Sequence, residues 1–258
     1  IRFLKDQGRL PELATLVTSV VTDRFGAAIA KSLDVQHVEA LTGFKNICGK
    51  IREFEATGKH AYIMGYEESI GYALGQEVLD KDGISALVFL AHAAAREKAA
   101  GHSLWERLQV LQEEHGYFVS QPVRHSLAGE HGQRLKDEVM RSFRHLTGKD
   151  FRRLSGPGAD LELVLKDDYL QQRSFTYETS GETLVVHSQL IDELRSDVLR
   201  FFFADGSWFA IRPSGTEPTL KFYFYGQAQT EAAATKQAER LADLADRVIQ
   251  EIRNTVDS

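Results

Sequence analysis

The sequence predicts a three-layer α/β domain followed by an α+β domain that is built on an antiparallel sheet. Over about the first 115 residues, short apolar runs alternate with segments of helical periodicity, a pattern typical of α/β layers. After Gly116, apolar runs are instead joined by short turns, and a long amphipathic segment closes the chain. We therefore predict one domain over residues 1–116 and a second over 117–258.

The first domain is expected to alternate strands with helices. Its first strand, 13–21, is a continuous apolar and β-branched run, as expected for a strand that is buried on both faces. Ser103 and Glu106 have the spacing of a capping box and therefore mark the start of a helix. The other expected elements are strands over 34–41 and 61–65 and helices over 24–33, 45–57 and 84–98.

The second domain is expected to contain a hairpin of two apolar strands, 198–204 and 207–212. Asp205 and Gly206 separate these strands, and an Asp-Gly pair between apolar runs favours a type I′ turn. Residues 152–182 combine mixed polar runs with a Gly-Pro-Gly sequence at 156–158, which predicts a loop-rich segment. The other expected elements are strands over 117–127 and 220–226 and helices over 133–143 and 229–254, the last with Leu241, Leu244, Val248 and Ile252 on one stripe.

The composition is that of a soluble globular protein, with 43% hydrophobic and 26% charged residues among 258. A formal net charge of -6 argues against a nucleic-acid partner, which would require a basic surface. No apolar run reaches the roughly 18 residues that span a bilayer, so no membrane partner is expected. The single cysteine, Cys48, cannot form an intrachain disulfide, which favours a cytoplasmic location and a packing role. The first residue is Ile1 rather than Met, which suggests a processed or truncated chain.

The segment 212–218, which joins two apolar strands, is the most specific feature of the sequence. Arg212 can offer a fork of N–H groups, Ser214 and Thr216 offer hydroxyls, and Gly215 lets backbone amides approach an anion closely. These donors suit a phosphate ester. The alternative is a Ser-Gly turn whose arginine pairs with a neighbouring carboxylate.

The segment 65–71 follows a predicted strand, where α/β proteins often bind ligands. Glu67 and Ser69 are two residues apart and face the same side of an extended chain, where they could bind vicinal sugar hydroxyls. Glu68 would face the other side and have a structural role. A solvated acidic turn is the alternative, and a glycosidase that uses Glu67 and Glu68 is a weaker one, because its two carboxyl groups must face each other across a bond.

Two further segments contain residues that could contact a ligand. Lys81 precedes a predicted helix and could reach an anion, although a charged turn with Asp82 as the N-cap is the simpler interpretation. The Thr-Gly-Phe-Lys sequence at 42–45 presents the same choice. The histidines have no metal-ligand spacing, so we expect no metal site in this chain.

Taken in order, the segments 42–45, 65–71, 80–83 and 211–218 resemble motifs of the α-D-phosphohexomutase superfamily. This superfamily includes phosphoglucomutases and phosphomannomutases. The resemblance extends from about Leu4 to the C-terminal helix. It is closest to the phosphoglucomutase and phosphopentomutase-like branch, in which an aromatic residue precedes the paired glutamates.

The resemblance implies which part of such an enzyme is present. The family has four domains: the first carries a serine that holds the transferred phosphoryl group, and the second binds Mg²⁺ through an Asp-rich loop. Neither motif occurs in this sequence. We therefore expect 1–116 to be domain 3 and 117–258 to be domain 4, with a TATA-binding-protein-like fold. Domains 1 and 2 would be missing partners, and a glucose 1,6-bisphosphate-type activator is implied.

The resemblance also implies roles for single residues. Glu67 and Ser69 would bind the 3- and 4-hydroxyls of the sugar. Lys81 matches a lysine near the phosphoserine and is the one catalytic candidate in this chain. The loop beside the sugar would contribute Thr42, Gly43 and Lys45, and the ester phosphate would be held by Arg212, Ser214, Gly215 and Thr216.

This sequence departs from the family pattern at two positions. Many members have Gly-His after the serine, whereas Gly71 and Tyr72 follow Ile70 here, so the role of that histidine has no counterpart. Tyr66 replaces a common glycine and could set sugar preference.

The implied reaction interconverts a sugar 1-phosphate and a sugar 6-phosphate through a phosphoserine and a bisphosphate intermediate. This half would supply sugar and phosphate binding to the isomerase, and it is expected to be inactive alone. The alternative is a free-standing, non-catalytic phosphosugar-binding module. The pattern does not distinguish glucose, mannose, ribose and amino sugars.

Overall fold

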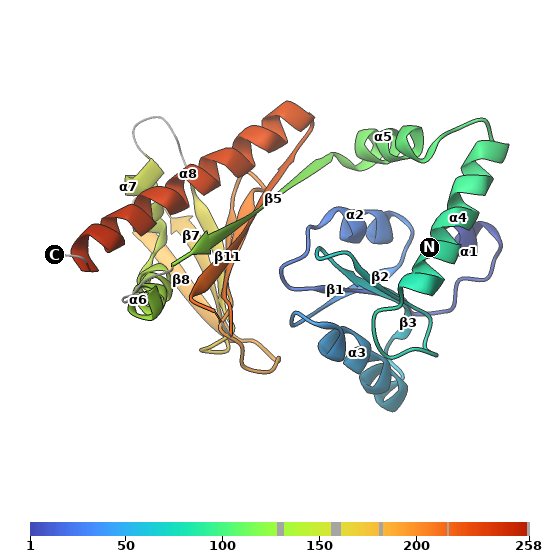
Figure 1. Cartoon of the computed structure of the whole chain (residues 1–258), viewed down its shortest axis with the longest axis horizontal. Coiled ribbons are helices and arrows are strands. Elements are labelled where there is room, and N and C mark those ends of the chain that lie inside the picture. The colour runs from blue at the N-terminus through green and yellow to red at the C-terminus, as the bar shows by residue number, and fades with distance from the viewer. Residues whose placement is uncertain (128–131, 156–160, 181–182, 216, 257–258) are drawn as a thin grey trace. The chain divides into compact units, whose positions relative to one another are not determined.

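The computed structural model describes residues 1–127, 132–155, 161–180, 183–215 and 217–256. The chain forms two compact units, Ile1–Gly116 and Tyr117–Ser258 (Figure 1). We refer to them as unit 1 and unit 2. Within the described ranges, no helix combines the length and the apolar character needed to cross a bilayer.

Unit 1, all of whose residues the structure describes, is built on a sheet with the strand order β2-β1-β3-β4. β1 pairs in parallel with β2 and β3, and β4 pairs antiparallel to β3. β4 is not predicted from the sequence, because it is only four residues long and follows directly on a tight connection. The strands are β1 Ala14–Ser19, β2 Gln36–Ala40, β3 Ala61–Glu67 and β4 Gly71–Leu74.

Helices pack on both faces of this sheet. Leu16 and Val17 are neighbours in β1 and therefore point to opposite faces. Val17 packs with Ile47 of α3, whereas Leu16 packs with Ala30 of α2. This confirms the predicted three-layer α/β architecture. The helices are α1 Arg2–Asp6, α2 Phe25–Ser32, α3 Phe44–Thr57, α4 Gly83–Ala99 and α5 Leu104–His115.

The predicted helix starts are confirmed in α4 and α5. Asp82 caps α4 by accepting a hydrogen bond from the Ile84 amide at 2.9 Å. Ser103 and Glu106 form both bonds of the capping box at α5. The apolar periodicity of α4 does not translate into burial, however, since Ile84 is 79% exposed and Leu87 is 66% exposed.

Unit 2 contains the predicted antiparallel sheet, which has seven strands in the part of the chain that the structure describes. The order is β5-β11-β10-β9-β6-β7-β8, and every neighbouring pair is antiparallel. The strands are β5 Tyr117–Ser126, β6 Leu163–Asp168, β7 Arg173–Ser180, β8 Thr183–Leu190, β9 Leu199–Phe203, β10 Trp208–Pro213 and β11 Thr219–Ala228.

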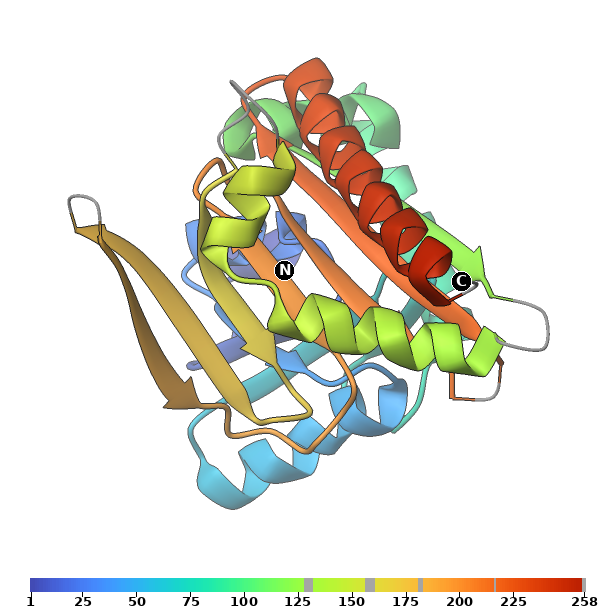
Figure 2. The ribbon, with the colours of Figure 1, turned by 90° about the vertical axis from the view of Figure 1, so that its left-hand side faces the viewer.

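Helices from the described part of unit 2 cover one face of this sheet (Figure 2): α6 Gly132–His145, α7 Gly148–Ser155 and α8 Glu231–Val256. Phe143 of α6 and Phe151 of α7 are fully buried against Phe201 and Phe209 of the sheet. The predicted stripe of α8 is also buried in this core, as the burial of Leu241, Leu244, Val248 and Ile252 shows.

The expectation of a loop-rich segment over 152–182 is wrong for the described residues. This segment contains the end of α7 and the strands β6 and β7. The Gly-Pro-Gly sequence lies outside the described residues. The strands escape detection because Lys166, Asp167 and Asp168 of β6 are buried although they are charged, so the apolar pattern that identifies a strand is missing.

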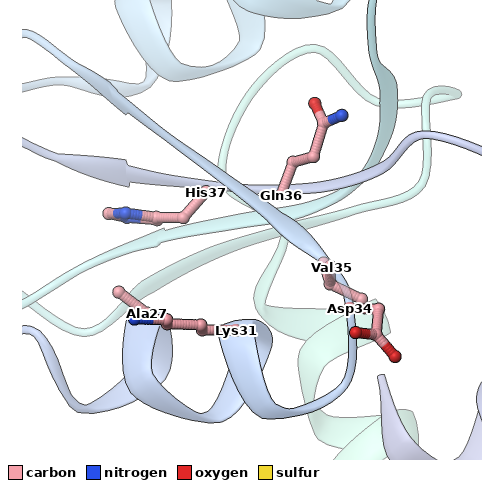
Figure 3. Close-up of a pocket in the computed structure, with 6 residues that line it drawn as sticks. All are labelled: Ala27, Lys31, Asp34, Val35, Gln36 and His37. Atoms are coloured by element: carbon pink, nitrogen blue, oxygen red, sulfur yellow. The ribbon is translucent and has the colours of Figure 1, made fainter.

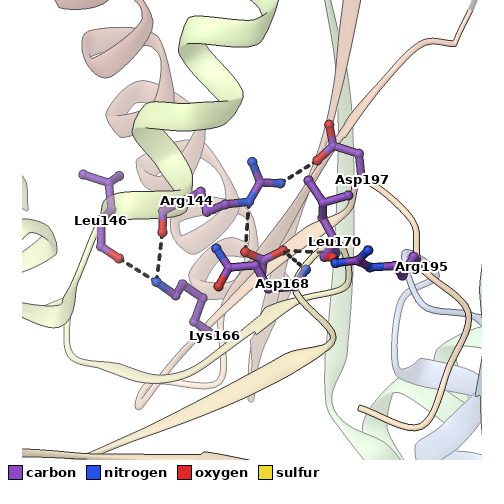
Figure 4. A network of polar contacts seen from close by, with 8 residues as sticks. Arg144, Leu146, Lys166, Asp168, Leu170, Arg195 and Asp197 are labelled. Atoms are coloured by element: carbon purple, nitrogen blue, oxygen red, sulfur yellow. Dashed lines mark hydrogen bonds and ion pairs between the residues drawn. The ribbon is translucent and has the colours of Figure 1, made fainter. Parts of the chain in front are cut away.

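Buried partners compensate these charges. Asp167 accepts hydrogen bonds from Arg200 at 2.7 Å and from the Ser174 hydroxyl at 2.6 Å. Arg144 bridges Asp168, at 2.9 Å, and Asp197, at 2.6 Å (Figure 4). A buried charge is tolerated when it is paired and hydrogen-bonded in this way.

Lys166 belongs to the same network. Its ammonium donates to the carbonyl oxygens of Arg144 and Leu146, at 3.1 and 3.2 Å (Figure 4). These carbonyls lie at the C-terminus of α6, where the helix dipole favours a cation. The network therefore ties the end of α6 to β6.

The predicted type I′ turn at Asp205 and Gly206 is also wrong. Only Gly206 has a positive φ, of +85°, whereas a type I′ turn requires two such residues. The Gly206 amide donates to the Phe203 carbonyl at 3.0 Å, and the Phe203 amide donates to the Ser207 carbonyl at 2.9 Å. The hairpin thus has a three-residue loop, 204–206, that ends in a left-handed glycine.

A glycine in β3 provides a test of the packing in unit 1. A Cβ atom at Gly65 would lie 2.4 Å from Ile47 and 2.7 Å from the Tyr62 hydroxyl. We expect Gly65→Ala to lower the free energy of unfolding by about 1–3 kcal/mol, because the core must shift. The measurement is urea unfolding followed by circular dichroism, with hydrogen exchange of β1 as a probe of unit 1.

Gly49→Ala is the matched control. Gly49 lies within α3, and a Cβ atom there would meet nothing within 4 Å. Alanine should therefore stabilise the helix by about 0.5–1 kcal/mol. Equal effects of the two substitutions would contradict the packing described for Gly65.

Candidate functional site

The connection between β3 and β4, residues 67–71, is called the Glu67 loop. Glu67 and Gly71 are paired across the two strands, which fixes the loop at the end of the sheet. The Ser69 hydroxyl donates to one carboxylate oxygen of Glu67 at 2.9 Å. The backbone amide of Gly43 donates to the other oxygen at 3.1 Å. The structure therefore brings Gly43, from the segment 42–45, together with Glu67 and Ser69 of the segment 65–71.

Glu68 faces other partners, as the sequence predicts. Its carboxylate accepts hydrogen bonds from the hydroxyls of Ser19 and Thr22, at 3.1 and 3.0 Å. Burial raises the pKa of the Glu68 carboxyl. Glu68 thus anchors the Glu67 loop to the connection between β1 and α2. Because Glu67 and Glu68 bind different groups, they do not form the facing pair that a glycosidase needs.

Tyr66 lies away from Glu67. A Cβ atom at Gly26 of α2 would lie 2.1 Å from the Tyr66 hydroxyl, so the tyrosine occupies the space that this glycine leaves. Burial also raises the pKa of the Tyr66 phenol. The tyrosine therefore ties β3 to α2, and the described contacts give it no part in the cluster of Glu67, Ser69 and Gly43.

The remaining predicted residues of unit 1 lie at the starts of α3 and α4. Thr42 is half-buried, and its carbonyl accepts a hydrogen bond from the Asn46 side chain at 2.9 Å. Lys45 and Lys81 are exposed. Within the described ranges, no hydrogen bond or ion pair joins the Lys81 ammonium to the Glu67 loop.

The segment 212–218, which contains the end of β10 and the connection to β11, is called the Arg212 loop. The Ser214 amide donates to the Thr219 carbonyl at 2.8 Å and closes the loop. Gly215 is exposed, and a Cβ atom there would meet nothing within 4 Å, so its backbone is open to approach. Thr216 lies outside the described residues. The Pro218 carbonyl accepts a hydrogen bond from the Leu127 amide at 2.8 Å, which holds the far end of the loop.

A row of cationic residues crosses the sheet beside this loop. Arg212 of β10 is directly opposite Lys221 of β11, and Lys221 is directly opposite Arg124 of β5. Residues that are directly opposite in antiparallel strands point to the same face. Their neighbours Ile211 and Phe222 lie in the core, so the three cations point away from it.

None of the three cations has an ion-pair partner among the residues that the structure describes. This contradicts, for those residues, the alternative in which Arg212 pairs with a neighbouring carboxylate. Like charges in one row repel each other, and a bound anion would relieve this repulsion. The alternation of residues in β11 already predicts that Lys221 points away from the core. The presence of Arg124 in the same row, however, follows only from the pairing of β5 with β11.

The structure also contains a hollow of about 390 Å³ between α2 and β2 (Figure 3). Its lining includes His37, whose Nε2 lies 2.8 Å from the Thr18 hydroxyl. No residue from the predicted motifs lines it. Among the described residues, no group of three or more histidine, cysteine, aspartate or glutamate side chains could hold a metal ion.

Comparison with known proteins gives two family models that match successive parts of the chain. Residues 1–113 match the model described as phosphoglucomutase/phosphomannomutase, alpha/beta/alpha domain III. Residues 158–244 match the model described as phosphoglucomutase/phosphomannomutase, C-terminal domain.

The curated relatives include a phosphoglucomutase of Staphylococcus haemolyticus, which is 29% identical over 224 residues, 86% of this chain and 38% of the relative. A phosphoglucomutase of Staphylococcus aureus is 28% identical over 208 residues, 81% of this chain and 35% of the relative. The chain thus spans little more than a third of the length of these relatives.

Among solved structures, the open form of pp63/parafusin, a phosphoglucomutase from Paramecium, superposes with a TM-score of 0.63 at 18% identity. The match covers 94% of this chain and 38% of that one. At this identity the likeness shows the fold alone.

The buried carboxyl of Glu68 gives a pH-dependent test of the Glu67 loop. Its pKa is raised on folding, so the folded chain binds more protons than the unfolded chain between the ordinary and the raised pKa. The stability of the wild type relative to Glu68→Gln should therefore fall as the pH rises through this window. The measurement is the free energy of unfolding of both proteins at a series of pH values. A difference that does not change with pH would contradict the burial of this carboxyl.

Proposed function

Because the chain belongs to the phosphoglucomutase/phosphomannomutase family, of which it carries domain III and the C-terminal domain, we propose that it binds a phosphosugar in a phosphoglucomutase-like enzyme. In this proposal unit 1 binds the sugar hydroxyls and unit 2 binds the ester phosphate. The domain boundary is taken to fall between residues 116 and 117, where the two compact units divide.

The observation that carries the proposal is the row of Arg212, Lys221 and Arg124 beside an open loop. A phosphate ester is a compact anion that accepts hydrogen bonds from several directions. Arg212 can bind it with two parallel N–H groups, and Ser214 and Gly215 add a hydroxyl and a backbone amide. Thr216 completes the proposed set by its place in the motif.

The Glu67 loop supports the second half of the proposal. Each carboxylate oxygen of Glu67 already accepts one hydrogen bond, from Ser69 or from Gly43, and each has a further lone pair. Two adjacent sugar hydroxyls can donate to these positions. Because the donors hold the carboxylate in place, little entropy is lost when the sugar binds. Thr42 and Lys45 are proposed to lie beside the sugar.

For the whole protein we propose the interconversion of a sugar 1-phosphate and a sugar 6-phosphate. Such a reaction requires the sugar to be held in two orientations while one phosphate remains bound. Hydroxyl contacts through Glu67 and Ser69 suit this requirement, because both orientations can present vicinal hydroxyls. Lys81 is proposed to act near the transferred phosphoryl group. The phosphoserine, the Mg²⁺ ligands and a bisphosphate activator belong to the proposal for the parts outside this chain.

We also propose that the protein acts in the cytoplasm, because a chain with a single cysteine cannot form an intrachain disulfide. Cys48, the single cysteine, is buried, and burial raises the pKa of its thiol. A thiol of this kind is a poor nucleophile. Cys48 is therefore assigned to packing, with no part in the reaction.

Calorimetry with two ligands tests the binding roles. We expect Arg212→Ala to raise the Kd for both inorganic phosphate and glucose 1-phosphate by about tenfold or more, because a charged, two-pronged contact is lost. Arg134→Ala, which removes an exposed arginine of α6, is the control. An unchanged Kd for Arg212→Ala would refute the phosphate site.

The same ligands separate the two loops. Glu67→Gln should raise the Kd for glucose 1-phosphate by about threefold to tenfold and leave that for inorganic phosphate unchanged. Glu55→Gln, which makes the same change at an exposed position of α3, is the matched control. If Glu67→Gln affected neither ligand, unit 2 would be a phosphate-binding module without a sugar site in unit 1.

An activity assay tests the assignment of the reaction to the whole protein. The 258-residue chain should convert no glucose 1-phosphate to glucose 6-phosphate in an assay coupled to oxidation of the product. The physical reason is that it lacks the family's serine motif, so no group can donate the phosphoryl. Turnover that Arg212→Ala abolished would show that the chain contains its own nucleophile.

A further inference from the structure

One charged residue interrupts the buried stripe of α6. The buried positions of this helix in the described chain are Gly132, Leu135, Lys136, Val139, Met140 and Phe143. Lys136 is only 9% exposed, although its neighbours on the stripe are apolar and pack in the core. Burial of a lysine is costly, and a polar residue that breaks a local pattern often marks a functional position.

Lys136 reaches the Arg212 loop. Its ammonium donates to the carbonyl oxygen of Ser214 at 3.3 Å. Within the described ranges this is its one hydrogen-bond partner, and it has no ion pair. A lysine ammonium has three donors. Among the described residues, the Lys136 ammonium therefore has one neutral acceptor and no carboxylate to balance its charge.

The contact determines the direction of the next amide. In a trans peptide the C=O and N–H groups point in opposite directions. Lys136 holds the carbonyl of the Ser214–Gly215 peptide toward α6, so the Gly215 amide points away from α6. Nothing lies within 4 Å of a Cβ atom at Gly215, so the loop is open beside the α-carbon of this residue.

The charge of Lys136 acts on the same peptide. A cation at a carbonyl oxygen draws electron density from the peptide group and makes its N–H a stronger donor. Ser214 is held at its other backbone group as well, because its amide donates to Thr219. Both polar backbone groups of Ser214 are thus fixed, and its hydroxyl has no partner among the described residues.

We propose that Lys136 is a positioning residue of the phosphate site, which acts through the Ser214 carbonyl to aim and strengthen the Gly215 amide as a donor to the phosphate. This inference rests on the proposed function of the Arg212 loop. Lys136 does not touch the ligand in this arrangement. Its positive charge also lies beneath the loop, where it adds to the field of Arg212 and Lys221.

Lys136→Met separates this role from a structural one. Methionine is unbranched like lysine, only one atom shorter, and suits the apolar stripe, so the melting temperature should be no lower than that of the wild type. The Kd for inorganic phosphate should nevertheless rise about fivefold. The amide signal of Gly215 should shift on phosphate addition in the wild type and much less in the variant. Arg134→Met, which makes the same charge change at an exposed position of α6, is the control.

Two conservative variants serve if Lys136→Met fails to fold. Lys136→Arg keeps the cation and should bind phosphate within about twofold of the wild type, whereas Lys136→Gln keeps a donor without the charge and should bind about threefold more weakly. Equal affinities of these two variants would overturn the role of the charge.

The outcomes also separate this inference from the proposed function. If Arg212→Ala abolishes phosphate binding while Lys136→Met binds like Arg134→Met, Lys136 has no positioning role and the phosphate site stands. If Arg212→Ala binds phosphate normally, the proposed function itself fails.

Discussion

The register of three strands, β10, β11 and β5, is the constraint on which the phosphate site depends. It places Arg212, Lys221 and Arg124 in one row and pairs Pro213 with Leu220 at the base of the Arg212 loop. A slip of one residue would turn each cation into the core. Stacking of Trp208 on Tyr225, with ring centres 4.2 Å apart, helps to exclude such a slip, because these residues are paired in the observed register.

In both units, groups that would not touch a ligand hold the groups that would. Glu68 fixes the Glu67 loop through two hydroxyls, and Lys136 fixes the Arg212 loop through one carbonyl. Each arrangement buries a charge or a titratable group at some cost in stability. Because each loop is held in place before binding, it needs little reorganisation when a small anion or sugar binds, and this favours tight recognition.

Much of the fold could be predicted from the sequence, because apolar periodicity and capping residues act locally. β1, α5 and the stripe of α8 are examples. β6 could not be predicted, because its buried Lys166, Asp167 and Asp168 break the apolar pattern. Their charges are compensated by hydrogen bonds and ion pairs to residues from other parts of the chain, which only the folded structure brings close. The exposure of α4 could not be found either, since periodicity gives a helix but does not decide what covers it.

In the candidate site, too, local motifs can be predicted from the sequence, whereas contacts between distant segments cannot. Motif spacing singles out Glu67, Ser69 and Arg212, whereas the bond from Gly43 to Glu67 requires two segments that are 24 residues apart to meet. Asp205 and Gly206 form a three-residue loop instead of the expected turn, because Asp205 does not adopt a left-handed conformation. Lys136 follows no motif at all, and its relation to the Arg212 loop depends on the packing of α6 beside β10.

The carboxylate of Glu67 is shared between its own loop and the start of α3. A change at Gly43 that moved the backbone amide would alter the direction of Glu67, and a change at Ser69 would do the same from the other oxygen. The effects of substitutions in these two segments on sugar choice are therefore coupled, as expected for groups that share a partner. Along an evolutionary lineage, a new sugar preference would then arise from changes that are each favourable only on the background of the other, so the order in which they occur would matter.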